Sequence, residues 1–394
     1  MFTASLSVSV LLVPRTMNRF LCLLCVWMGM LCAWPFLSAQ AWNVEALFDQ
    51  AIAVDVPPGA FRYNWRDAVL LKSFIDIYRV DPQQREHIAS YIRGEMERCA
   101  EKAHGYHPNG VASAVGLAFL KEIGADSEKT REALSRVERQ YGNIARAANG
   151  ACSHRTSFVE LWDDTLYMIG MFLTGSYQAT GDASYLHQLS QQVLAHAEHL
   201  CDNKTGLWYH GWAESMYPTM DECCQYAWNS NPSHRNSEFW GRGNGWVAMT
   251  MVDLLALLPA DDADYASVKA LFVRMMNTLS RLQDKKTGLW YQLPAHPRDK
   301  ENFLESSCTA MFGYAAAKGA RLGILSPAFS RVGKAAYEGL IRHCLEADGT
   351  RLGRICAGTC IGDKSYYYHR DIVAGTETYA TGAVLMLSCE IELY

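Results

Sequence analysis

The sequence predicts an all-α fold, an (α/α)6 barrel of six helical hairpins, and two observations carry that prediction. First, apolar helical segments alternate with charge-laced ones, as expected for helices buried on most sides and helices that face solvent. Second, the motif Asp202-Asn203-Lys204-Thr205-Gly206-Leu207-Trp208-Tyr209 recurs as Asp284-Lys285-Lys286-Thr287-Gly288-Leu289-Trp290-Tyr291. Repetition of one supersecondary unit indicates stacked hairpins.

The chain opens with a leader that we expect to lie outside this fold. Arg15 and Arg19 precede an apolar run over residues 20–37, which ends in Ser38-Ala39-Gln40-Ala41. A basic region, an apolar region and an A-x-A-like site form the pattern of a secretory signal. We therefore expect residues 1–41 to be a signal peptide, and the mature protein to be periplasmic or secreted without a stable membrane association. The alternative is a membrane anchor.

Residues 42–394 are expected to form a single catalytic domain with about 59 residues per hairpin, enough for two helices and their loops. The apolar, inner segments are 63–78, 111–123, 158–177, 246–258, 303–320 and 372–392. The polar, outer segments are 82–102, 127–148, 183–201, 263–283 and 328–346, after an amphipathic opener at 42–54. Strand character is confined to short pieces around 206–209 and 288–292. Since the loops entering inner helices gather at one end of such a barrel, polar residues that open an apolar helix mark the expected site.

Composition excludes some classes of function. The net charge is −5 and no Lys/Arg block occurs, so nucleic-acid binding is not expected. Of the thirteen cysteines, Cys223 and Cys224 are adjacent, and Cys356 and Cys360 are four apart. Neither pattern is a spaced zinc site. We therefore expect disulfides or buried thiols, with no metal and no cofactor.

The run Trp240-Gly241-Arg242-Gly243-Asn244-Gly245-Trp246 is the most unusual stretch of the chain. Glycines at this density allow positive φ and a close approach of the backbone to a ligand. Tryptophan offers a flat face to a sugar ring, and arginine offers a planar fork suited to a carboxylate. The run thus predicts the rim of a pocket for an acidic carbohydrate. A glycine-rich turn capped by core tryptophans is the alternative.

Two aspartates, Asp163 and Asp164, lie inside an otherwise apolar segment. A buried carboxylate is costly unless it is paired or held protonated. Successive helix positions diverge by about 100°, so only one of the two can point at a given spot. We expect an acid of raised pKa in a sugar pocket, and the alternative is a charge that interacts with the helix dipole.

Two histidines accompany this segment. His210 lies between aromatic residues in Trp208-Tyr209-His210-Gly211-Trp212, and could hydrogen-bond a sugar hydroxyl or carboxylate. The stretch Ser153-His154-Arg155, which contains the second histidine and lies just before the acidic segment, could supply positive charge to the same pocket. A structural histidine and a solvated turn are the respective alternatives.

Taken together, Trp162-x-Asp164-x-Leu166-Tyr167-Met168, His210-Gly211 and the glycine-rich run resemble the unsaturated glucuronyl and rhamnogalacturonyl hydrolases of glycoside hydrolase families 88 and 105. The resemblance implies an (α/α)6 barrel acting on an oligosaccharide with a 4,5-unsaturated uronic acid at its non-reducing end. It also implies that Asp164 is the general acid/base, and that His210, Trp240 and Arg242 bind substrate.

The sequence departs from the family at Asn109, where a second aspartate is usual. Asparagine can bond to hydroxyls but cannot raise the pKa of Asp164 by repulsion. Two alternatives remain open beside the unsaturated uronyl hydrolase. One is a retaining (α/α)6 glycosidase of the endo-mannanase type, with Asp163 and Asp164 as a pair, and the other is a catalytically silent barrel that binds acidic sugars.

Overall fold

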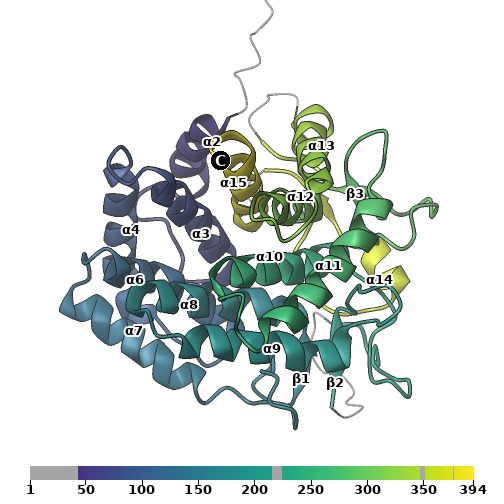
Figure 1. The fold of residues 1–394 in the computed structure, drawn as a ribbon, viewed down its shortest axis with the longest axis horizontal. Helices are drawn as coiled ribbons and strands as arrows, with labels where there is room; N and C mark the ends of the chain where they lie inside the picture. The colour runs from purple at the N-terminus through teal and green to yellow at the C-terminus, as the bar shows by residue number, and fades with distance from the viewer. Residues whose placement is uncertain (1–42, 215–223, 347–350, 376) are drawn as a thin grey trace, which may run out of the picture. The chain divides into compact units, whose positions relative to one another are not determined.

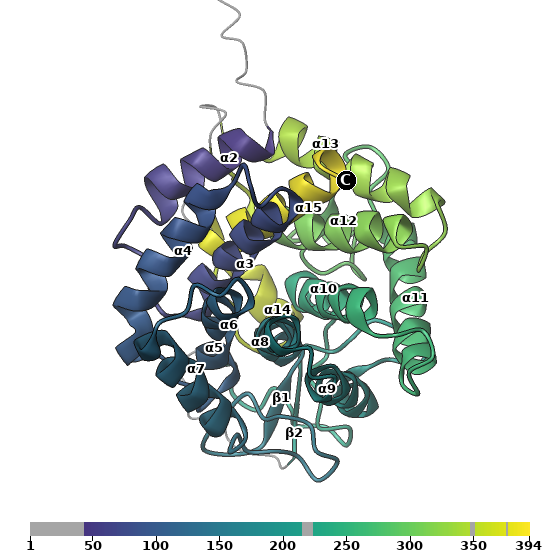
Figure 2. The same cartoon turned by 60° about the vertical axis from the view of Figure 1, so that its left-hand side comes forward.

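Six inner helices form a closed ring within the part of the chain that this computed structural model describes, residues 43–214, 224–346, 351–375 and 377–394. They are α3 (Trp65–Val80), α6 (Ala114–Glu122), α8 (Asp164–Thr180), α10 (Gly241–Leu257), α12 (Ser306–Arg321) and α15 (Thr378–Glu392). Each helix contacts the next, and α15 returns to α3, as Figure 2 shows. Most residues of these helices are buried, which explains their apolar sequences.

An outer layer of helices covers the ring (Figure 1). It consists of α4 (Glu86–Cys99), α7 (Glu128–Tyr141), α9 (Ser184–Leu200), α11 (Tyr265–Leu282) and α13 (Ala328–His343), with α2 (Val44–Gln50) and the π-helix η1 (Ala51–Asp55) at the start of the chain. Each of the first five packs on the inner helix that precedes it, and α2 packs on α15. The backbone N–H of Val44 donates to Glu392 at 2.9 Å and so joins the two ends of the domain. The predicted (α/α)6 barrel is confirmed.

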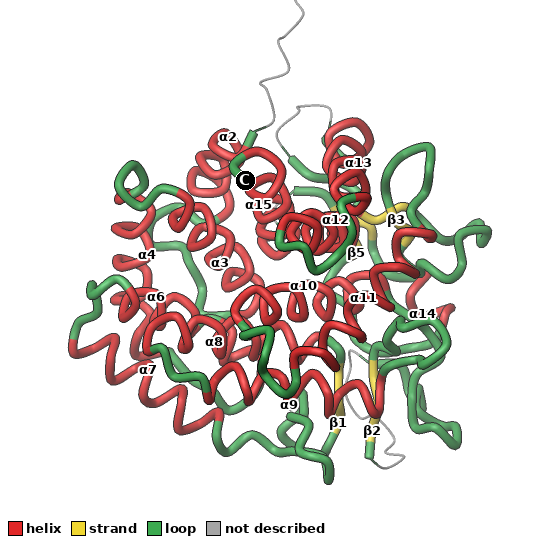
Figure 3. Tube along the Cα trace, in the orientation of Figure 1, coloured by secondary structure: helices red, strands yellow, loops and turns green. Residues whose placement is uncertain are grey.

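Short strand pairs precede several inner helices, and the sequence analysis did not foresee most of them. The pairs are β1 (Glu160–Trp162) with β2 (Gly211–Ala213), β3 (Trp290–Tyr291) with β4 (Leu304–Glu305), and β5 (Ile355–Cys356) with β6 (Ile372–Val373). Figure 3 shows strands as yellow segments within the loops. The helices predicted at 158–177 and 372–392 therefore begin later, at Asp164 and Thr378, because their first residues pair as strands. Shorter helical pieces are η2 (Ala100–Lys102), α5 (Pro108–Ala112) and α14 (Lys364–Tyr368).

The recurring motif forms the same turn twice. Asp202 accepts a hydrogen bond from the backbone N–H of Thr205 at 2.9 Å, and Asp284 accepts one from Thr287 at 2.8 Å. The following glycines, Gly206 and Gly288, have φ of 75° and 78°, a conformation that favours glycine. Both turns connect an outer helix to the next inner one.

All described residues belong to one compact unit, and none of its helices is both long and apolar enough to cross a bilayer. The predicted signal peptide at 1–41 lies outside the described residues.

Candidate active site

A cavity of about 330 Å³ opens where several inner helices begin. Six of the residues singled out from the sequence line it: Asn109, His154, Trp162, Asp164, Trp240 and Arg242. The seventh, His210, has no exposed surface and lies directly behind Asp164. The site therefore brings together residues that are up to 133 positions apart in the sequence, from Asn109 to Arg242.

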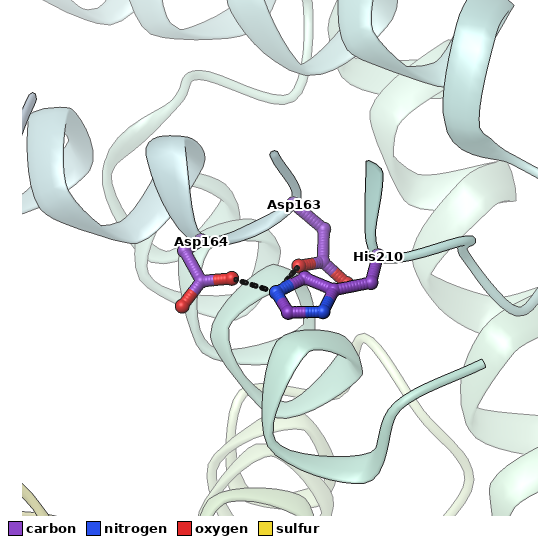
Figure 4. A group of neighbouring side chains, drawn as sticks. All are labelled: Asp163, Asp164 and His210. Atoms are coloured by element: carbon purple, nitrogen blue, oxygen red, sulfur yellow. Dashed lines mark hydrogen bonds and ion pairs between the residues drawn. The ribbon is translucent and has the colours of Figure 1, made fainter. Parts of the chain in front are cut away.

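The two adjacent aspartates have different surroundings (Figure 4). Asp164 is the first residue of α8, and 14% of its side chain is exposed, toward the cavity. Asp163 occupies the cap position, is fully buried and has no hydrogen-bond partner for either carboxylate oxygen. Only Asp164 can touch a molecule bound in the cavity.

Their pKa values move in opposite directions. Burial, reinforced by the neighbouring Asp164, raises the pKa of Asp163 well above its usual range, so this carboxyl is protonated. Burial is the largest single influence on Asp164 and acts to raise its pKa, but the hydrogen bond and electrostatic interaction with His210, together with the neighbouring Asp163 and His154, lower that pKa to about 2. The expectation of a raised pKa is wrong for Asp164 in the free protein, because no local pattern pointed to its histidine partner.

His210 is held beside Asp164 by strand pairing. Trp162 of β1 pairs with Gly211 of β2, and the backbone N–H of Asp163 donates to the carbonyl of His210 at 3.0 Å. The ring nitrogen Nε2 then lies 3.1 Å from Asp164 Oδ2 and 4.0 Å from Asp163 Oδ1. His210 thus contacts the acid rather than the cavity itself.

The glycine-rich run is the first turn of α10, which begins at Gly241 instead of the predicted 246. Gly241, Gly243 and Gly245 do not use the positive φ that glycine allows, since all three are helical. The prediction of a close approach is right, but the approaching group is protein. A Cβ on Gly243 would lie 2.3 Å from Asp163 Oδ2, so Gly243 makes room for the buried carboxyl.

Arg242 is almost fully buried, with its guanidinium 4.3 Å from the ring centre of Trp240 and 4.7 Å from that of Tyr379. It donates to the carbonyls of Cys356 at 2.6 Å and Ala357 at 2.8 Å. Some of the N–H groups of the Arg242 guanidinium therefore hold the backbone at the end of β5 in place. Two of its five N–H donors suffice for those carbonyls, so the expected role of Arg242 toward a ligand carboxylate stays a prediction.

His154 stacks on Trp162 with ring centres 4.4 Å apart. Its nitrogens lie 3.0 Å from Thr165 Oγ1 and 3.4 Å from Asn109 Nδ2. Burial lowers the pKa of His154 to about 3, so it is neutral at neutral pH, and the positive charge expected from this stretch comes from Arg155, which also lines the cavity. Asn109 is suited to this neutral ring, because its amide can donate to an unprotonated nitrogen.

Sequence reasoning missed other residues that line the cavity, among them Trp65, Arg66, Met168 and the segment 358–360. Arg66 forms an ion pair with Glu377 at 2.8 Å, and Arg155 lies 3.5 Å from Glu160. With Arg242, these side chains give the cavity three arginines. Trp65 and Arg66 open the first inner helix, so the rule that polar residues at the start of an apolar helix mark the site could have found Arg66.

One group of described residues has the spacing of a metal site. Asp163, Asp164 and His210 each offer one ligand atom, and these atoms lie within 4.8 Å of one another. The contact of His210 with Asp164 is an ordinary acid–histidine hydrogen bond, and Cys356 is a free thiol.

We predict that chelation leaves activity unchanged, because protonation by a carboxyl group needs no metal. Dialysis against a chelator, followed by a rate measurement with and without added divalent cations, checks this. A loss of activity that added metal restores would identify Asp163, Asp164 and His210 as a metal site.

Comparison with known proteins gives consistent results. A family model described as Glycosyl Hydrolase Family 88 matches residues 46–394. The unsaturated rhamnogalacturonyl hydrolase YesR of Bacillus subtilis is 26% identical over 307 residues, which cover 76% of this chain and 81% of that protein. A solved glycoside hydrolase of family 105 from C. acetobutylicum is 26% identical with a TM-score of 0.77, covering 89% of this chain and 99% of that one. The solved unsaturated glucuronyl hydrolase from Bacillus sp. GL1 shares the fold at 14% identity, with a TM-score of 0.63 and coverage of 89% and 95%.

Proposed function

Because the chain belongs to glycosyl hydrolase family 88, we propose that this glycosidase removes a 4,5-unsaturated uronic acid from the non-reducing end of lyase-generated oligosaccharides. The observation that carries the proposal is the number of carboxyl groups that line the cavity. Asp164 is the one carboxylate among its described lining residues, and it stands among three arginines. A single positioned carboxyl suits the hydration of an enol ether, whereas ordinary glycoside hydrolysis uses two.

The proposed reaction uses Asp164 twice. Its carboxyl gives a proton to C4 of the unsaturated sugar, which leaves a cation stabilised by the ring oxygen at C5. Water attacks C5, and its proton returns to the Asp164 carboxylate. The hemiketal at C5 opens to a C5 ketone and leaves a hemiacetal at C1. Collapse of this hemiacetal breaks the glycosidic C1–O bond and releases a 4-deoxy-5-keto uronic acid and the shortened oligosaccharide, so atoms and charge balance with the net addition of one water.

Substrate itself favours the protonated form of Asp164. In the free protein this carboxyl is ionised, since its pKa is lowered to about 2. A uronate carboxylate brought into the same cavity raises the pKa of Asp164 by like-charge repulsion. The arginines Arg66, Arg155 and Arg242 supply the opposite charge that holds the uronate there.

The paired-aspartate alternative, of the endo-mannanase type, lacks support from the geometry. It requires two carboxyl groups that flank the glycosidic bond. Asp163 is buried against Gly243 and does not line the cavity, so it cannot take the second position.

The test is a screen of unsaturated oligosaccharides with defined second sugars, including rhamnogalacturonan, ulvan and glycosaminoglycan fragments. We expect loss of the unsaturated chromophore with at least one of them, and no action on the saturated counterparts. New reducing ends without chromophore loss would favour the paired-aspartate alternative. Binding without turnover would favour a silent acidic-sugar-binding barrel.

We also propose that the protein is exported to the periplasm or beyond, with cleavage close to Ala39 or Ala41. The support is the sequence pattern of residues 19–41. N-terminal sequencing of protein isolated from its native host is expected to begin near Gln40 or Trp42. A mature protein that still began at Met1 or Met17 would contradict cleavage.

A further inference from the structure

Behind the acid, the hydroxyl of Tyr367 joins a chain of hydrogen bonds that reaches Asp164. Tyr367 belongs to α14 and is fully buried. Its oxygen lies 2.8 Å from His210 Nδ1, and His210 Nε2 lies 3.1 Å from Asp164 Oδ2. Which atom donates in each of these hydrogen bonds decides which tautomer of His210 faces Asp164.

The lone pairs of the Tyr367 hydroxyl are already occupied. The backbone N–H of Gly362 donates to it at 3.4 Å, and the side-chain amide of Asn236 donates at 3.3 Å. A hydroxyl has two lone pairs and one proton. Since both lone pairs accept, the proton must point to His210 Nδ1.

The orientation of the Asn236 amide is fixed independently. Its oxygen accepts from the backbone N–H of Gly211 at 3.0 Å, and its nitrogen donates to the carbonyl of Glu238 at 3.0 Å. An inverted amide would set two donors against each other at Gly211 and two acceptors at Glu238. The amide nitrogen therefore faces Tyr367.

The tautomer of His210 follows from the hydrogen bonds that Tyr367 makes. Because Nδ1 accepts from Tyr367, the ring proton of neutral His210 lies on Nε2 and is donated to Asp164 Oδ2. An imidazolium would place a second donor between Nδ1 and a hydroxyl with no free lone pair. This arrangement gives the buried carboxylate of Asp164 a hydrogen-bond donor.

We propose that Tyr367 is a positioning residue for the reaction, which holds His210 as the neutral Nε2–H tautomer that stabilises the carboxylate of Asp164. This inference rests on the proposed function. When the O–H bond of Asp164 breaks and the C4–H bond forms, negative charge develops on the Asp164 oxygens. A hydrogen bond to a charged acceptor is about twice as strong as a neutral one, so the donor from His210 lowers the barrier to that step.

The test compares two conservative variants of α14. Y367F removes the hydroxyl and keeps the buried ring. Y368F is the matched control, since the Tyr368 hydroxyl instead bonds to Asp299 at 2.9 Å, away from the cavity-lining residues. Nitrogen-15 NMR of histidine-labelled protein reports the tautomer, with the His210 signals assigned by their loss in H210Q.

We expect the wild type and Y368F to show His210 protonated on Nε2 alone. In Y367F, we expect protonation at Nδ1 to increase and kcat to fall by about 10–100-fold, the range for removing a partner that orients a histidine, with KM nearly unchanged. A wild-type His210 protonated on Nδ1 would overturn the inference without any variant, even if Y367F failed to fold. An unchanged tautomer and kcat in folded Y367F, or a change in Y368F equal to that in Y367F, would overturn it as well.

The spectra are recorded without substrate, which separates this inference from the proposed function. If no unsaturated uronide is turned over but the tautomers behave as expected, the function is wrong and the hydrogen-bond assignment stands. If turnover occurs and the wild-type tautomer is reversed, the role of Tyr367 alone is refuted.

Discussion

Replacing Asp164 by asparagine is expected to lower turnover of an unsaturated uronide by about 10²–10⁴-fold, the usual contribution of a general acid or base. Asparagine keeps the shape of the side chain but can neither give a proton to C4 nor take one from water. Because binding contacts remain, KM should change little. Steady-state kinetics on the substrate identified by the screen measures both constants.

The informative comparison is Asp163→Asn. We expect a smaller loss of turnover, since Asp163 has no exposed surface and is already neutral, and an amide of the same shape replaces it. Asp182→Asn, at an exposed position between α8 and α9, should leave turnover unchanged. If Asp163→Asn proves the more damaging change, Asp163 rather than Asp164 carries the proton that reacts.

Arg242→Ala is expected to damage both the fold and the site. It removes one hydrogen bond from each of the carbonyls of Cys356 and Ala357, which keep the hydroxyls of Tyr379 and Thr359 as donors, at about 1 kcal/mol for each lost bond. It also removes a side chain packed against two aromatic rings. Urea denaturation should therefore show a lower free energy of unfolding. Arg242→Lys should lower the free energy of unfolding by less, because lysine keeps the positive charge, although it lacks the planar fork of arginine.

Substrate capture separates the two roles of Arg242. Loss of its positive charge should raise KM for a uronate more than for a neutral sugar. Arg342→Ala is the control, since that side chain is 68% exposed on α13 and its pair with Glu338 lies on the surface. Equal effects on neutral and anionic ligands would remove the carboxylate role and leave Arg242 as a structural residue.

The sequence alone determined the architecture and six of the thirteen described residues that line the cavity. Helix burial depends on local periodicity, so alternating apolar and polar segments were enough to predict two layers of helices. The same logic located Asp164 and Arg242, because each lies near the start of an inner helix, whereas Asn109 came from the family resemblance. Helix starts were less well predicted where strands intervene, since pairing of β1 with β2 joins residues about 50 positions apart.

Only the tertiary structure decided how these residues work. Which of two adjacent aspartates keeps a proton depends on His210, 46 positions away, and on the space left by Gly243. The partners of Arg242 are carbonyls more than 110 positions further along the chain. Likewise, the tautomer of His210 depends on Tyr367, 157 positions away. Protonation and donor direction are set by burial and by partners that only the folded chain brings within hydrogen-bonding distance, so no local pattern could have specified them.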